Sequence, residues 1–267
     1  MIEEAPSAAL DIDQRVAVTS AAVRLAEAVE YRGAGTIEML LAADGAFHFL
    51  EMNTRLQVEH PVTELVTGLD LVRAQIHVAA HGTLPFEQAG IHRHGHAIEA
   101  RVYAEDAARG FLPQAGIATR VRWPHGPFVR VDRGIEAGDE VTVHYDPMLA
   151  KVIAFGPDRE AALARLTGAL DALRVHGVVT NLSFLRALAR APQVATAAFD
   201  TEWIEREFLP GLEALMRAPV PDLALAAAAI AEAMGPGRPG REDGGAEPAE
   251  QDPFQLLGRW RAPGLDA

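Results

Sequence analysis

The spacing of apolar residues predicts helices and strands in the first ninety residues. Apolar positions recur at helical spacing in two segments, and two short extended segments lie between them. Asp44-Gly45, which separates the extended segments, is a strong signal for a β-hairpin turn. We therefore expect strands over 35–42 and 46–52 and helices over 11–30 and 61–81, the second helix with a break at Gly68 and an end at Gly82.

Beyond residue 95 the pattern changes to short β-like segments separated by Gly, Pro and Asp. These segments are 97–103, 119–123, 128–132 and 148–155. Helical periodicity returns over 158–175 and over 181–190. Residues 235–252 contain no large apolar side chain and are rich in Pro, Gly and Glu, which predicts a linker or disordered segment. The mixture of helices and strands indicates the α+β class.

The hairpin turn sets the register of its two strands. If Asp44 and Gly45 form a two-residue turn, the facing pairs are Ala43–Ala46, Leu40–Phe49 and Glu38–Glu51. Two carboxylates directly opposite one another destabilise a sheet, unless a cation lies between them or one of them takes up a proton. Carboxylate oxygens suit Mg²⁺ or Mn²⁺. Two solvated glutamates on an exposed face are the alternative, and the pair alone favours this alternative.

Polar residues continue at alternate positions after the hairpin. In an extended chain they share one face, which carries Glu51, Asn53, Arg55, Gln57 and Glu59. The opposite face carries Leu50, Met52, Leu56 and Val58 and is suited to burial. An ordinary solvated strand is richer in Thr, Ser and Lys. Carboxylate, amide and guanidinium groups in one row are instead typical of a site that binds a metal, holds a small oxyanion and removes its proton.

Composition narrows the classes of function. The formal charge of −13 argues against nucleic acid as the main partner, because phosphate binding needs a basic face. The chain has no cysteine, which excludes disulfides and thiolate sites and suits a reducing cytoplasm. We also expect no secretory signal, because the first residues lack a basic and an apolar region, and no membrane span, because no apolar run is long enough.

The run EMNTRLQVEHPVTE, from Glu51 to Glu64, resembles the signature of the biotin carboxylase family of ATP-grasp enzymes. Further matches are EEAP at 3–6, YRGAGT at 31–36, GHAIEARVYAED at 95–106, FLP at 111–113, YDPMLAK at 145–151 and TN at 180–181. The resemblance covers about residues 1–208. It implies an α+β fold, with the C-terminal part of an ATP-grasp domain followed by the mixed α/β biotin carboxylase C-terminal domain.

The same resemblance implies a division of the chain into four segments. Residues 1–90 match the C-terminal part of the ATP-grasp domain, and residues 91–209 match the biotin carboxylase C-terminal domain. We expect an Ala-rich segment and a disordered linker over 210–252, and the start of a following domain over 253–267. The lid and the phosphate-binding lysines of the family have no counterpart here. Because phosphoryl transfer needs several cations on the phosphates, we expect the chain alone to have no ATP-dependent turnover.

The resemblance implies that one group of residues binds ATP and metal. Glu38 and Glu51 match residues that bind Mg²⁺ or Mn²⁺ at the ATP phosphates, and Asn53 matches an assisting metal ligand. Leu40 and Val178 match apolar contacts beside the adenine.

A second group matches the catalytic end of the site. Arg55, Gln57 and the backbone of Val58 match the bicarbonate pocket, where a guanidinium suits a planar oxyanion. Glu59 matches the general base that deprotonates bicarbonate, and Arg101 matches the residue that stabilises the biotin enolate. Arg55 is counted with Glu59 and Arg101 among the catalytic residues.

The implied function is ATP-dependent carboxylation of biotin through carboxyphosphate, as the biotin carboxylase component of an acyl-CoA carboxylase. The implied partners are ATP, bicarbonate, a biotin carrier domain that bears the biotin as substrate, and a carboxyltransferase subunit. Homodimerisation through the second domain is expected, without nucleic acid or membrane. The alternatives are another ATP-grasp carboxylate–amine ligase, which does not explain the residues from Arg55 to Glu59, and a non-catalytic assembly or dimerisation fragment.

Three further patterns carry weaker signals. Glu99 and Arg101 share a strand face and, without the resemblance, indicate a cross-sheet or surface ion pair. Lys151 is the only lysine of the chain, and a structural role in the second domain is favoured over a catalytic amine. The alternating residues His92, His94 and His96 favour a solvated or hydrogen-bonded cluster over a zinc site, because no fourth ligand is near in the sequence.

Overall fold

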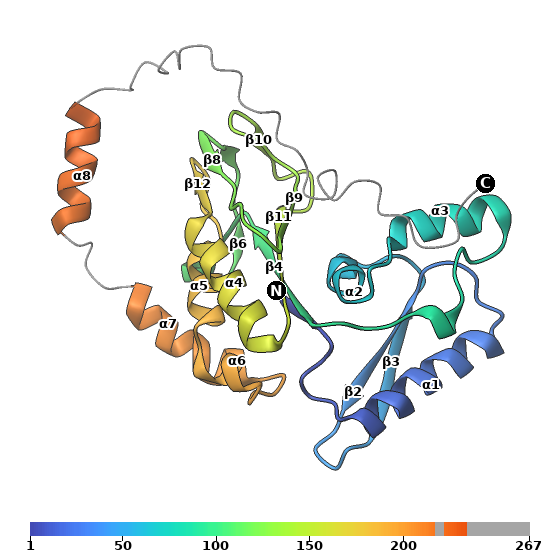
Figure 1. Ribbon diagram of the computed structural model, residues 1–267. Helices are drawn as coiled ribbons and strands as arrows, with labels where there is room; N and C mark the ends of the chain where they lie inside the picture. The colour runs from blue at the N-terminus through green and yellow to red at the C-terminus, as the bar shows by residue number, and fades with distance from the viewer. Residues whose placement is uncertain (217–221, 234–267) are drawn as a thin grey trace. The chain divides into compact units, whose positions relative to one another are not determined.

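The computed structural model describes residues 1–216 and 222–233 (Figure 1). Met1–Arg217 form one compact unit, and Ala218–Ala267 form a second one, of which α8 (Asp222–Ala233) is described. The predicted linker at 235–252 and the predicted domain start at 253–267 lie outside the described residues. None of the helices in the described ranges is long and apolar enough to cross a membrane.

The first ninety residues form a hairpin with helices around it. The elements are β1 (Ile2–Ala5), α1 (Ile12–Ala28), β2 (Thr36–Leu41), β3 (Phe47–Asn53), α2 (His60–Thr67), α3 (Leu71–His81) and the short 3₁₀ turn η1 (Gln88–Gly90). The predicted break at Gly68 is confirmed, because Gly68 and Gly82 both adopt φ 73° and end α2 and α3. At the start of α1, Asp11 and Gln14 form a reciprocal capping box.

The hairpin turn is one residue longer than predicted. Ala42 pairs with Ala46, so the loop comprises Ala43, Asp44 and Gly45, the last with φ 84°. The longer loop shifts the register, so that Leu40 faces His48, and the predicted Leu40–Phe49 pair is wrong. A β-bulge then inserts Leu50 and shifts the register back. The predicted pairing of Glu38 with Glu51 is therefore confirmed, although two compensating irregularities produce it.

The predicted extended run as far as Glu59 is wrong. Strand β3 ends at Asn53, and the chain turns before α2 begins at His60. Because the hairpin pairing stops at Asn53, the next residues are not held in an extended strand, and their side chains need not alternate between two faces. The expected burial of the apolar face also fails at Leu50, which is 53% exposed.

A four-stranded antiparallel sheet, in the order β1-β4-β11-β9, forms the centre of the second part. Its strands besides β1 are β4 (His96–Tyr103), β9 (Val129–Arg133) and β11 (Met148–Gly156). The remaining elements are β5 (Glu105–Asp106), η2 (Ala107–Arg109), β6 (Leu112–Pro113), β7 (Gly116–Ile117), β8 (Arg120–Arg122), β10 (Glu140–Val141), α4 (Arg159–Ala172), β12 (Arg174–His176), α5 (Leu182–Ala189), α6 (Pro192–Thr196), the π-helix η3 (Ile204–Phe208) and α7 (Leu209–Met216). The helix predicted over 158–175 ends earlier, because Arg174–His176 pairs with β8 instead.

The two faces of this sheet are covered by different helices. On one face, Ile98 and Val102 of β4 belong to a buried core with Leu166 and Leu170 of α4. On the other face, Val62 and Val66 of α2 form a smaller cluster with Ala97 and Ile153. Alternation along β4 therefore places Glu99 and Arg101 on the side of α2. This arrangement brings the segment before α2 close to the charged residues of the sheet.

Candidate functional site

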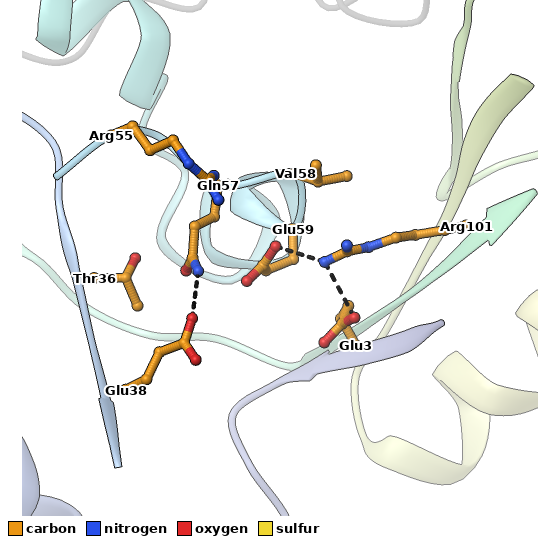
Figure 2. Close-up of a pocket in the computed structure, with 8 residues that line it drawn as sticks. All are labelled: Glu3, Thr36, Glu38, Arg55, Gln57, Val58, Glu59 and Arg101. Carbon is orange, nitrogen blue, oxygen red and sulfur yellow. Dashed lines mark hydrogen bonds and ion pairs between the residues drawn. The ribbon is translucent and has the colours of Figure 1, made fainter. Parts of the chain in front are cut away.

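A cavity of about 460 Å³ lies where the hairpin, the start of α2 and the sheet meet (Figure 2). Its lining residues come from β1, β2, β4 and the segment that precedes α2. They are Glu3, Thr36, Glu38, Arg55, Gln57, Val58, Glu59 and Arg101. All the residues predicted for bicarbonate binding and catalysis thus lie around one cavity, although β3 does not extend to them.

The two facing carboxylates of the hairpin share amide donors. The Asn53 Nδ2 donates to Glu38 Oε1 at 2.7 Å and to Glu51 Oε1 at 3.0 Å. The Gln57 Nε2 also donates to Glu38 Oε1, at 2.8 Å. These amide hydrogens reduce the repulsion between the carboxylates, which opposite positions in the ladder impose.

The chemistry of this donor set fits a hard divalent cation. Two carboxylates and one amide oxygen suit Mg²⁺, which usually takes only one or two protein carboxylates and shares the rest with phosphates and water. Asn53 would present its oxygen instead of its nitrogen, which a rotation of the amide achieves. Within the described part of the chain, no group of three or more His, Asp or Glu residues could hold a metal. A Mg²⁺ ion held by Glu38, Glu51 and Asn53 would therefore need its remaining ligands from a substrate and from water.

Glu59 and Arg101 form the central ion pair of the cavity. Glu59 is the N-cap residue of α2, but its side chain makes no capping hydrogen bond. Instead its Oε2 accepts from Arg101 Nη2 at 2.7 Å, and the same nitrogen lies 3.1 Å from Glu3 Oε1. Burial alone would lower the pKa of Arg101, but Glu3, Tyr103 and Glu59 together outweigh this effect and raise it. A fixed positive charge is thus held at the cavity wall.

Arg55 differs from Arg101 in its surroundings. Its Nη1 donates to the carbonyl oxygen of Leu56 at 3.3 Å, and no ion pair within 4 Å involves it among the described residues. Its guanidinium is therefore available for a bound anion, for which planar geometry is well suited.

Several predicted residues lie elsewhere. Glu51 and Asn53 are joined to Glu38 but do not line the cavity. Leu40 is 41% exposed on β2, whereas Val178 is 7% exposed and packs with Ala104, Val141 and Leu149. The structure does not bring Leu40 and Val178 to the cavity.

Two cavity residues were not predicted from the sequence. Glu3 reaches the site because β1 pairs with β4, and Thr36 begins β2. Glu3 lies in the EEAP run, but no local pattern indicates that this strand pairs with residues almost one hundred positions later. Thr36 lies in the YRGAGT run and has no pattern that indicates a role.

The weaker signals have different outcomes. The ion pair between Glu99 and Arg101 is not formed, because Glu99 is fully buried with both oxygens unpartnered and Arg101 binds Glu3 and Glu59. A strand face covered by α2 is not a solvent surface. His96 is instead part of a hydrogen-bonded pair, in which its Nε2–H donates to Glu4 Oε2 at 2.9 Å.

Comparison with known proteins identifies the two parts of the chain. Residues 1–87 match the family described as Carbamoyl-phosphate synthase L chain, ATP binding domain. Residues 99–206 match the Biotin carboxylase C-terminal domain. Residues 99–206 thus belong to the Biotin carboxylase C-terminal domain family. The α+β fold, with ATP-grasp sequence before the biotin carboxylase C-terminal domain, is confirmed. The boundaries at 90 and 209 stay predictions.

Two curated relatives of this chain are subunits of acyl-CoA carboxylases. The mitochondrial methylcrotonoyl-CoA carboxylase subunit alpha of Dictyostelium discoideum is 46% identical over 86% of this chain and 33% of its own length. The mitochondrial propionyl-CoA carboxylase alpha chain of Homo sapiens is 44% identical over 81% of this chain and 30% of its own length. The chain thus spans about a third of the length of these relatives.

The solved structures give the same fold. The biotin carboxylase domain of the 2-oxoglutarate carboxylase of Hydrogenobacter thermophilus, in complex with MgADP, ADP and bicarbonate, has a TM-score of 0.75 and 38% identity. The match covers 77% of this chain and 45% of that domain. That domain was solved as a dimer.

Proposed function

We propose that this chain supplies the bicarbonate-activating part of a biotin carboxylase. Glu59 removes the proton from bicarbonate, while the Arg55 guanidinium holds the oxyanion. The Gln57 amide and the Val58 backbone complete the bicarbonate pocket. The observation that supports this best is that all four residues share one cavity with Arg101, which lies 42 positions after Glu59.

The proposed reaction proceeds through carboxyphosphate. Deprotonated bicarbonate attacks the γ-phosphate of ATP, a new P–O bond forms, and ADP leaves. Carboxyphosphate splits into CO₂ and phosphate, and the phosphate takes the ureido proton of biotin. The enolate of biotin then attacks CO₂, and the fixed positive charge of Arg101 stabilises the enolate oxygen.

ATP and a divalent cation are the proposed cofactors. Glu38, Glu51 and Asn53 would hold Mg²⁺ or Mn²⁺, which would neutralise charge on the ATP phosphates. Leu40 and Val178 are proposed to contact the adenine. Leu40 is exposed and accessible for this contact, whereas Val178 would have to leave its buried cluster.

The proposed partners follow from the names of the relatives. We propose that the biotin is carried by a carrier domain, that a carboxyltransferase subunit receives the carboxyl group, and that the chain dimerises through its second part. Methylcrotonoyl-CoA and propionyl-CoA enzymes are nearly equally similar, so identity does not separate the acyl-CoA substrates. The related subunits named above are mitochondrial, and a cytoplasmic location of this chain stays a prediction.

A chimeric enzyme tests the proposed catalysis. Residues 1–208 replace the matching segment in the Hydrogenobacter thermophilus biotin carboxylase domain, and bicarbonate-dependent ADP release is measured with free biotin. We expect turnover in the chimera and a loss of about a hundredfold or more in kcat with Glu59→Gln or Arg55→Met. Arg109→Met is the matched control, because Arg109 is 76% exposed and lies outside the cavity. A folded chimera without turnover, or an unchanged Glu59→Gln variant, would contradict the proposal.

Calorimetric titration of this chain with Mg·ADP tests the alternatives. Binding that weakens when Glu38 or Glu51 becomes Gln supports a nucleotide site. No binding favours the assembly or dimerisation function instead. Another ATP-grasp ligase would bind Mg·ADP but would lose no activity with Arg55→Met in the chimera. The chain alone is expected to release no ADP.

A further inference from the structure

We propose that Lys151 is a positioning residue, which holds the Val58 carbonyl and thereby fixes the backbone that carries Glu59 into the cavity. This inference rests on the proposed function of Glu59. Lys151 does not line the cavity, so it has no direct contact with a bound substrate. Its effect on the reaction passes through the peptide that precedes Glu59.

Lys151 is buried between the sheet and the segment before α2. It lies on β11, directly opposite Arg101 of β4 and Asp132 of β9, and it is 9% exposed. Its Nζ donates to the Val58 carbonyl oxygen at 3.0 Å and lies 3.1 Å from Asp132 Oδ2. A buried ammonium is stable only with such partners. The Val58 carbonyl oxygen and the Asp132 carboxylate therefore hold the Lys151 ammonium group in one position.

The Val58 carbonyl belongs to the peptide unit that includes the Glu59 nitrogen. Because this unit is planar, a fixed carbonyl oxygen also fixes the direction in which Glu59 leaves the backbone. The Glu59 carbonyl oxygen then accepts a hydrogen bond from the Val62 N–H, in the first turn of α2. The side chain, which is not used for capping, extends to Arg101. The orientation of the proposed base therefore depends on a lysine more than ninety positions away.

The partner of Lys151 is itself fixed to α2. Asp132 accepts two hydrogen bonds from Arg130, at 2.7 and 3.0 Å. Arg130 Nη1 also donates to Glu64 Oε2 at 2.8 Å. Burial alone would raise the pKa of Asp132, but Arg130 and Lys151 outweigh burial and lower it, so the anion persists. The sheet therefore holds Val58 in the segment before α2 and Glu64 within α2, and only Val58 adjoins Glu59.

Kinetics of the chimeric enzyme test the inference. With Lys151→Met, which keeps an apolar stem of similar length, we expect kcat to fall about ten- to a hundredfold. We expect the KM for ATP to change by less than about twofold, because Lys151 contacts no proposed ATP ligand. Arg109→Met is again the control. A kcat within about twofold of the unsubstituted chimera, or an equal effect on the KM for ATP, would overturn the inference.

A chemical rescue in this chain gives a second readout that needs no turnover. The chain has no cysteine, so Lys151→Cys creates a single thiol. Alkylation of the unfolded variant by 2-bromoethylamine, with loss of bromide, produces a lysine analogue, and alkylation by a propyl halide produces an apolar side chain of the same length. After refolding, hydrogen exchange at the Val62 amide should be slow in the first product and at least about tenfold faster in the second.

The two experiments separate the possible failures. If the unsubstituted chimera is folded but inactive, the proposed function fails, and the exchange data still decide whether Lys151 holds the Val58–Glu59 backbone. If the chimera is active and the amine makes no difference to exchange at Val62, the positioning role is wrong and the proposed function stands.

Discussion

Replacement of Glu99 by Gln is expected to stabilise the folded chain at neutral and alkaline pH. Glu99 is fully buried, and neither carboxylate oxygen has a hydrogen-bond partner. Burial raises its pKa to about 7 from the ordinary 4.5, and the charges of Lys151 and Arg101 oppose this effect. Glu3 on β1 and Asp132 on β9 face the same group and raise the pKa further.

The sign of the pH dependence follows from this raised pKa. A carboxyl group that binds a proton more tightly after folding contributes stability below pH 4.5, and this contribution is lost as the pH rises through about 7. The difference between the two values, at about 1.4 kcal/mol for each tenfold change in the protonation equilibrium, corresponds to about 3 kcal/mol. Glutamine has the same shape and no charge, so Glu99→Gln avoids the loss.

Urea unfolding of both proteins at several pH values measures this effect. We expect the advantage of Glu99→Gln in the free energy of unfolding to grow by about 2 to 3 kcal/mol between about pH 5 and about pH 8. Glu27→Gln, at an exposed position of α1, is the control and should show no such trend. An advantage that stays constant with pH, or that decreases, would refute the argument that Glu99 is desolvated.

Two further substitutions test how the backbone is held. Gly95 has φ 62°, and a Cβ at this position would collide with the Gly156 carbonyl oxygen, so Gly95→Ala should lower the free energy of unfolding by more than about 2 kcal/mol in urea. A smaller loss would contradict this and would mean that the start of β4 moves away from Gly156 at little cost. Asp11→Ala removes the capping box of α1 and should cost about 1 kcal/mol, seen as faster hydrogen exchange at the Gln14 amide; unchanged exchange would contradict this.

Local patterns predicted most of the helices and strands, and they predicted the pairing of the two hairpin carboxylates. Apolar periodicity and Gly68 located α2 and α3, and Asp44-Gly45 located the hairpin. The pairing of Glu38 with Glu51 was predicted from a register that is wrong nearer the turn. The sequence does not reveal the three-residue loop or the bulge at Leu50, because both depend on backbone dihedrals that many residues tolerate.

Long-range contacts were the part that local patterns could not supply. Glu3 reaches the cavity through the pairing of β1 with β4. Lys151 contacts Val58 from β11, which is far from Val58 in the sequence. Both contacts depend on strand order, which apolar spacing alone does not determine. The extended run to Glu59 was predicted from alternation, but the chain leaves the strand at Asn53 and the cavity still gathers Arg55 and Glu59. Proximity here comes from the turn before α2, not from a shared strand face.

Like charges face one another at three places around the proposed site. The pairs in direct register are Glu38–Glu51, Glu3–Glu99 and Arg101–Lys151. Each pair weakens its ladder, and each has a different compensation: amide donors for the first, a raised pKa for the second, and separate anionic partners for the third. A sheet selected for stability alone would avoid all three pairs. Because sequences that fold well violate such local rules mainly at functional sites, their concentration around one cavity argues that this surface is maintained for chemistry.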